Sequence, residues 1–162
     1  HGLSTLKDTE ARRLARFVTT ADAAAMTAEA RDELLKRVLD SIGVAIGALD
    51  GEPVGYVRAL VADFGGAPHC TLIGGGKTAP DRATFYNTAL VRYLDFMDAY
   101  LAKGETCHPS DNLGAVLAAA EYADRSGADF LSALAVAYQL RSRLSDVAPV
   151  RNKGFDHTVQ GA

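Results

Sequence analysis

The sequence has few cysteines, no tryptophan and no excess of positive charge. Its 162 residues include only two cysteines, Cys70 and Cys107, which lie far apart in the chain. Lysine and arginine number 17 against 20 aspartates and glutamates, a formal net charge of -3, so no broad cationic surface is available for nucleic acid or for an anionic membrane. The sequence also lacks an apolar run of transmembrane length and a basic-then-apolar leader. We therefore expect a protein of the reducing cytoplasm that binds neither nucleic acid nor membrane.

The composition is that of a globular domain. Hydrophobic residues make up 48% of the chain and charged residues 23%, which excludes intrinsic disorder and fibrous repeats. No repeat of fixed period and no low-complexity linker divides the sequence. We predict one domain over residues 1–162.

Apolar residues recur at helical spacing along most of the chain. We expect helices over Ala11–Val18, Thr27–Leu49, Pro53–Phe64, Pro80–Leu101, Ser110–Ala120 and Ala128–Ala148. Only His69–Ile73 has the character of a strand, so at most one or two short strands are expected there. The predicted fold class is mainly all-α, with about six helices.

Two patterns suggest ligand sites but lack the spacing that such sites need. Gly74–Thr78 follows a predicted strand, as a phosphate-binding loop would, but the first glycine of that motif would fall on Thr71. His69–Cys70 and Cys107–His108 contain possible zinc ligands, yet zinc ligands normally come in pairs about two to four residues apart. We predict no nucleotide site, no metal site and no cofactor.

Polar side chains capable of acid–base chemistry lie close to apolar helix faces. Asp95 and Asp98 are three residues apart on one predicted helix, and a carboxylate beside an apolar face is costly unless it is paired. An ion pair of Asp98 with Arg92 would be a purely structural explanation. His108 precedes the most apolar helix, whose N-terminus offers free amides to an anion. A structural or solvated role remains the alternative for His108 and for His157.

Three segments in this order resemble the MmgE/PrpD family: Arg92–Asp98 (RYLDFMD), His108–Leu113 (HPSDNL) and Gly154–His157 (GFDH). Leu39–Gly47 is also similar to the second helix of that family, and the resemblance spans nearly the whole chain. It implies a largely helical domain joined to a smaller α/β lid. It also implies a cofactor-free lyase, decarboxylase or epimerase that acts on small polycarboxylates as a homodimer.

The resemblance further implies a set of site residues. The residues expected to be catalytic are Asp95, His108 and His157. From the residues themselves we expect Asp98 and the Ser110 hydroxyl to bind the substrate, together with the basic residues close in sequence to the histidines, Lys103, Arg151 and Lys153.

We therefore expect residues 1–162 to be the N-terminal helical part of a longer two-domain enzyme whose lid is absent from this sequence. The expected reaction is removal of water from a 2-methylcitrate-like tricarboxylate, with the two imidazoles as base and acid in an order that the sequence leaves open. A cis-aconitate-type decarboxylase, a small-dicarboxylate epimerase and a non-catalytic helical dimerisation module are the alternatives. We expect the isolated chain to self-associate through the outer side of residues 113–120 and to be inactive.

Overall fold

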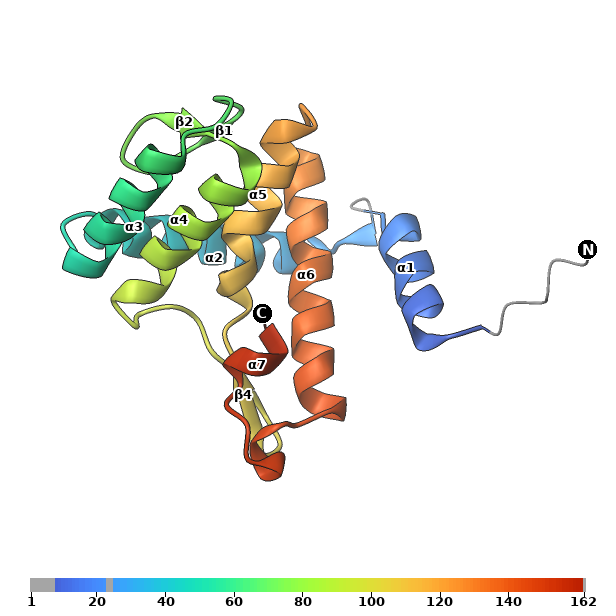
Figure 1. Cartoon of the computed structure of the whole chain (residues 1–162). Helices are drawn as coiled ribbons and strands as arrows, with labels where there is room; N and C mark the ends of the chain where they lie inside the picture. The colour runs from blue at the N-terminus through green and yellow to red at the C-terminus, as the bar shows by residue number, and fades with distance from the viewer. Residues whose placement is uncertain (1–7, 23–24, 162) are drawn as a thin grey trace, which may run out of the picture.

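The computed structural model describes residues 8–22 and 25–161, and these residues form a mainly helical fold (Figure 1), which confirms the predicted class. The α-helices are α1 (Glu10–Thr20), α2 (Ala28–Gly47), α3 (Glu52–Phe64), α4 (Pro80–Tyr93), α5 (Leu113–Tyr122), α6 (Gly127–Val147) and α7 (Thr158–Gly161). The antiparallel hairpins of the described residues are β1 (Cys70–Thr71) with β2 (Lys77–Thr78), and β3 (Tyr100–Ala102) with β4 (Glu105–Cys107). The short 3-10 helices are η2 (Pro109–Asn112) and η3 (Arg151–Lys153). Across the described part of the chain, no helix has both the length and the apolar character needed to cross a bilayer.

Capping residues explain where several helices begin and end. Thr27 precedes α2, and its hydroxyl accepts the backbone N–H of Ala30 at 3.2 Å. Pro53 lies in the first turn of α3, and Gly65 ends that helix with a φ of 64°, a conformation that glycine adopts without strain. Ser126 forms a capping box at the start of α6. The sequence predicted these boundaries because the signals are local.

The predicted helix over Pro80–Leu101 is too long. α4 ends at Tyr93, and Asp95 has a φ of 57°, in the left-handed region that helices do not use. The chain then runs into the β3–β4 hairpin, which lies outside the segment where strands were expected. Met97 and Leu101 keep helical spacing, but Met97 is buried and Leu101 is 78% exposed. The two side chains therefore do not pack on one face of a helix, as their spacing suggested.

α5 lies between α4 and α6 in the centre of the molecule (Figure 1), and its closest approach is to α4. A Cβ atom on Gly114 would lie 2.5 Å from Thr88 Oγ1 and 3.0 Å from the backbone oxygen of Thr84. Leu90 of α4 and Leu134 of α6 are fully buried on either side. The glycine therefore lets two helix backbones touch at the core.

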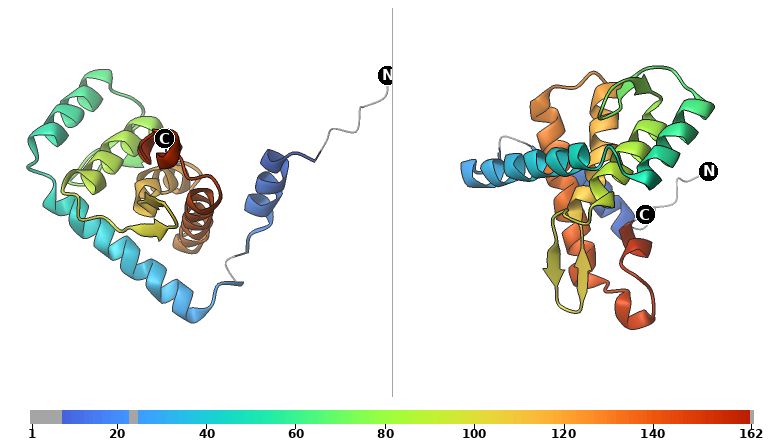
Figure 2. Two further views of the ribbon diagram at one scale, coloured as in Figure 1. Left: turned by 90° about the horizontal axis from the view of Figure 1, so that it is seen from below. Right: turned by 90° about the vertical axis from the view of Figure 1, so that its left-hand side faces the viewer.

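The two hairpins lie at opposite ends of this helical core (Figure 1). β1 is held to α5 because the Cys70 thiol donates to the Ala118 carbonyl at 3.2 Å and the Thr71 N–H donates to the Glu121 carboxylate at 2.8 Å. β3 and β4 pack along α6. After α6 the chain turns back beside this second hairpin and reaches α7 (Figures 1 and 2), so the C-terminal segment returns to the end of α4.

We expect Gly114→Ala to destabilise the protein by about 1–3 kcal/mol, because the methyl group would press on the Thr88 hydroxyl and on backbone atoms of α4. Gly55→Ala is the matched control, since a Cβ there meets nothing within 4 Å and alanine favours the helix by about 0.5–1 kcal/mol. Urea unfolding of both variants measures the difference. Equal changes in the free energy of unfolding for the two variants would show that α4 and α5 are not in close contact at Gly114.

Candidate active site

His108 and His157 lie side by side. Their ring centroids are 5.2 Å apart and the rings are inclined at 66°. His108 follows β4 and His157 immediately precedes α7, so the returning C-terminal segment brings together two residues that are distant in sequence. Both imidazoles are partly buried.

Asp98 holds His108 in one tautomer. His108 Nδ1 lies 2.7 Å from the backbone oxygen of Asp98. A carbonyl oxygen only accepts, so Nδ1 carries a hydrogen, and in the neutral imidazole Nε2 then keeps a lone pair. The Asp98 carboxylate accepts the N–H of Ser110 at 3.0 Å and so fixes the turn that follows His108. The neutral His108 therefore presents Nε2 as its basic atom.

Asp95, the carboxylate that the sequence favoured, is not part of this arrangement. Its side chain is exposed, and within the described ranges no hydrogen bond or ion pair joins it to either histidine. The reason is the early end of α4: with Asp95 in a left-handed conformation, Asp95 and Asp98 do not share a helix face. The structure places Asp98, rather than Asp95, against His108.

His157 has different partners. Its Nε2 lies 3.2 Å from Arg92 Nη2, and because a guanidinium only donates, Nε2 is the acceptor. Its Nδ1 lies 2.9 Å from Asp156 Oδ1. The Arg141 guanidinium donates to the backbone oxygen of His157 at 3.1 Å. The two imidazoles thus have different hydrogen-bonding and charged neighbours although they lie side by side.

Arg92, at the end of α4, joins His157 to Asp111 of η2. Its guanidinium lies 3.4 Å from the Asp111 carboxylate, so the ion pair that the sequence suggested with Asp98 is wrong. Burial raises the pKa of the Asp111 carboxyl, and the positive charges of Arg92 and Arg141 offset only part of that effect.

The sequence did not assign Arg92, Asp111 or Arg141 to the site. One signal was available for Arg141: it is a charged residue on the stripe of α6 that also carries Leu134 and Tyr138, and it is almost fully buried. A buried charge needs partners, and such groups gather at functional sites.

The other substrate-binding candidates lie at varied distances from the histidines. Ser110 is fully buried, and among the described residues its hydroxyl has no hydrogen-bond partner. Lys103 is exposed at the turn of the β3–β4 hairpin, five residues from His108 and up to about 16 Å away along an extended strand. Arg151 pairs with Glu105 at 3.7 Å, and Lys153 is exposed on η3. Over residues 8–22 and 25–161, no hydrogen bond joins any of these three basic side chains to a histidine ring.

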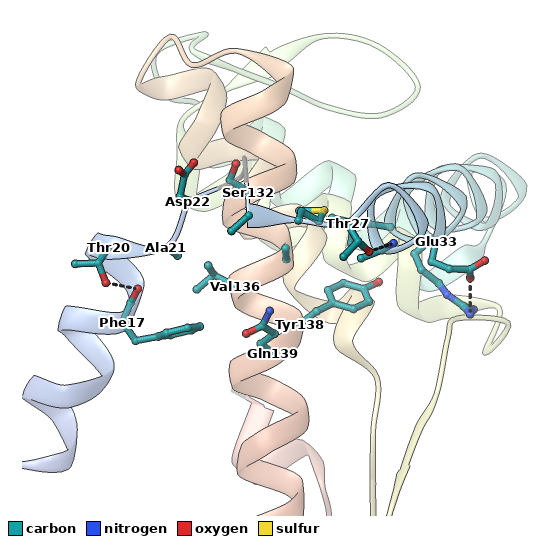
Figure 3. A pocket seen from close by; sticks show the side chains of 16 residues that line it. Phe17, Thr20, Ala21, Asp22, Thr27, Glu33, Ser132, Val136, Tyr138 and Gln139 are labelled. Atoms are coloured by element: carbon teal, nitrogen blue, oxygen red, sulfur yellow. Dashed lines mark hydrogen bonds and ion pairs between the residues drawn. The ribbon is translucent and has the colours of Figure 1, made fainter.

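A cavity of about 850 Å³ lies between α1, α2 and α6 (Figure 3), and the residues that line it include no histidine. Phe17 and Val136 form part of its wall, and Tyr138 reaches it from α6. Burial, together with the nearby Asp98 carboxylate, raises the pKa of the Tyr138 hydroxyl. Tyr138 therefore links this cavity to the residue that holds His108.

The arrangement supplies groups for acid–base chemistry on an anion. It combines a lone pair on His108, a second imidazole and two guanidinium groups, Arg92 and Arg141. In the portion of the chain that is described, no group of three or more histidine, cysteine, aspartate or glutamate side chains is arranged to hold a metal ion.

Comparison with known proteins gives a consistent match. The model of the MmgE/PrpD N-terminal domain family matches residues 12–162. The chain is similar to the mitochondrial 2-methylcitrate dehydratase of Yarrowia lipolytica, with 29% identity over 134 residues that cover 75% of this chain and 26% of that protein. It is also 27% identical over 134 residues to 2-methylcitrate dehydratase of Escherichia coli K12, covering 75% of this chain and 28% of the relative. The chain thus spans about a quarter of the length of these curated relatives.

We expect Asp98→Ala to lower the free energy of unfolding by about 1–3 kcal/mol, because it removes the acceptor for the Ser110 N–H and leaves that donor buried without a partner. Asp95→Asn should change the free energy of unfolding by less than about 0.5 kcal/mol, since asparagine tolerates the left-handed backbone. Within the described residues, the Asp95 carboxylate forms no hydrogen bond that the substitution would remove. Urea unfolding of the two variants compares them. A larger loss for Asp95→Asn would contradict the placement of these carboxylates.

Proposed function

The chain belongs to the MmgE/PrpD family, and from this premise we propose that it is the helical, histidine-bearing part of a dehydratase that acts on a 2-methylcitrate-like tricarboxylate. The observation that carries the proposal is the His108–His157 pair, 5.2 Å apart, with a different hydrogen-bond partner for each ring. The relatives named as 2-methylcitrate dehydratases support the choice of substrate.

Elimination of water beside a carboxylate needs a base that removes a proton from carbon and an acid that protonates the leaving hydroxyl group. We assign the base to His108, because the Asp98 carbonyl keeps its proton on Nδ1 and leaves Nε2 unprotonated. His157 is then the acid. Its Nε2 now accepts from Arg92, and it can carry a proton once that guanidinium turns to a substrate carboxylate, which is a stronger acceptor than a neutral imidazole.

The substrate carries several negative charges in a protein of net charge -3, so local cations must offset its desolvation. Arg92 and Arg141 are the cations that lie nearest the histidines in this proposal. The elimination moves one proton from carbon to His108 and one from His157 to the departing hydroxyl, and needs no cofactor. Cys70 and Cys107 are free and buried, which suits the reducing cytoplasm in which we place the reaction.

We expect His108→Ala to lower kcat for 2-methylcitrate dehydration by the whole protein roughly 100-fold or more, because a positioned base contributes about that factor. Lys36→Ala is the control, since Lys36 is exposed on α2 and forms an ion pair with Glu33 of the same helix. Steady-state release of the unsaturated product provides the measurement. Equal rates for the two variants would remove His108 from the mechanism, and a decarboxylated or epimerised product would assign the site to one of the alternative reactions.

We also propose that two copies of the chain associate through α2. Large apolar side chains form an exposed stripe along this helix, here called the α2 seam: Leu35, Leu39, Ile42 and Ile46, which are 40%, 74%, 37% and 56% exposed. Their spacing of four, three and four residues is that of a helix–helix seam. In contrast, the outward positions of α5 carry the small side chains of Ala115 and Ala119, so the surface expected on residues 113–120 offers less apolar area.

The α2 seam suits a second copy in antiparallel orientation. The helix runs along an edge of the molecule (Figure 2), where another helix can reach it. All its charged residues lie between Glu29 and Asp40, whereas residues 41–47 carry none. Antiparallel packing sets Leu39 against Ile42 and places each charged half against an uncharged half, whereas parallel packing would set like charges together.

We expect Leu39→Asp to shift the protein toward the monomer, because it places a carboxylate in the centre of the seam. Light scattering over a range of protein concentrations measures the mass. Leu101→Asp is the control, since Leu101 is 78% exposed on β3 and lies outside the seam. A dimer that survives Leu39→Asp, or a wild-type chain that is monomeric at all concentrations, would contradict this interface.

A further inference from the structure

Glu105 is a buried carboxylate outside the set of proposed catalytic groups. It is the first residue of β4, three positions before His108, and only 3% of its surface is exposed. Its Oε2 accepts the backbone N–H groups of Val150 at 2.8 Å and of Arg151 at 2.9 Å. Its Oε1 accepts the N–H of Thr106 at 3.1 Å and lies 3.7 Å from Arg151 Nε. Every oxygen of this buried group therefore faces a donor.

The two N–H groups from Val150 and Arg151 belong to the segment that leads from α6 to His157. Residues 151–156 of that segment are exposed, so few apolar contacts hold it to the rest of the molecule. The hydrogen bonds to the Glu105 carboxylate therefore hold in place a segment that apolar packing does not. Its hydrogen bonds are charge-assisted, which makes them stronger than those of a neutral acceptor.

Glu105 and His108 lie on one short stretch of chain, so whatever is fixed to Glu105 is also fixed relative to His108. We propose that Glu105 is a positioning residue that sets the distance between the His108 and His157 rings by tying the two segments together. Its consequence for turnover rests on the proposed dehydratase function, whereas its effect on the ring geometry does not.

The charge of Glu105 is present under working conditions. The N–H groups of Arg151, Thr106 and Val150, together with the Arg151 charge, hold the pKa of the Glu105 carboxyl below its usual range in spite of burial. The stabilisation from this tie is therefore fully present above the ordinary carboxyl pKa and is lost only as the pH falls through the lowered value.

Glu105→Gln tests the proposal because it keeps the shape of the side chain and removes the charge. In this chain, we expect the amides of Val150 and Arg151 to exchange with solvent roughly tenfold faster, while amides of α4 stay protected and report an intact fold. We also expect the cross-relaxation between His108 and His157 ring protons to weaken. Glu10→Gln is the control, since Glu10 is exposed on α1 and forms an ion pair with Arg13 of the same helix.

In the whole protein, we expect Glu105→Gln to lower kcat for 2-methylcitrate roughly tenfold or more while KM changes by less than about threefold, because misplacement of acid and base weakens the chemical step more than binding. Unchanged ring cross-relaxation would overturn the proposal. So would weakened cross-relaxation with an unchanged kcat. If the wild-type protein does not dehydrate 2-methylcitrate but cross-relaxation is lost in Glu105→Gln, the dehydratase function fails and the positioning role stands.

Discussion

The backbone contact between α4 and α5 at Gly114 is the constraint from which the site follows. Because the two helices touch there, the end of α4 lies beside the turn that opens α5. Arg92 can then reach Asp111 at 3.4 Å and His157 at 3.2 Å from the same guanidinium. A side chain at position 114 would separate the helices and move the arginine away from both partners. One small residue in the core thus determines where the Arg92 charge lies in the partly buried site.

The neighbourhood of the two histidines shows how a protein gives identical side chains different properties. His108 faces a carbonyl oxygen and keeps its Nε2 lone pair, whereas His157 faces a guanidinium on one side and a carboxylate on the other. These differences come from backbone and side-chain groups that are placed by three separate segments. Asymmetry of this kind is what acid–base catalysis by two imidazoles requires, since one must gain a proton while the other gives one up.

The helical class, the N-cap at Thr27 and the end of α3 at Gly65 could be predicted because their signals lie within a few residues of the boundary. The end of α4 could not be predicted in this way. Leu94, Met97 and Leu101 keep helical spacing, although the backbone leaves the helix and adopts a left-handed conformation at Asp95. The helical spacing therefore gave no sign that Asp95 and Asp98 lie on a turn and not on one helix. The partners of Arg92 and Glu105 were also out of reach, because they depend on where the chain returns after α6. Local patterns indicate elements, whereas a site made of distant segments depends on the packing between them.

The two buried cysteines have a consequence of a different kind. Cys70 donates to a carbonyl of α5, and the Cys107 thiol lies 3.9 Å from a carbonyl oxygen of α6. Burial raises the pKa of the Cys70 thiol, so in the folded protein it is both shielded and largely protonated. Each thiol becomes reactive only when its own hairpin detaches from its helix. The rate at which an alkylating reagent modifies each sulfur atom would therefore measure how often that hairpin opens. The rate at Cys107 would report on the end of the molecule that carries His108.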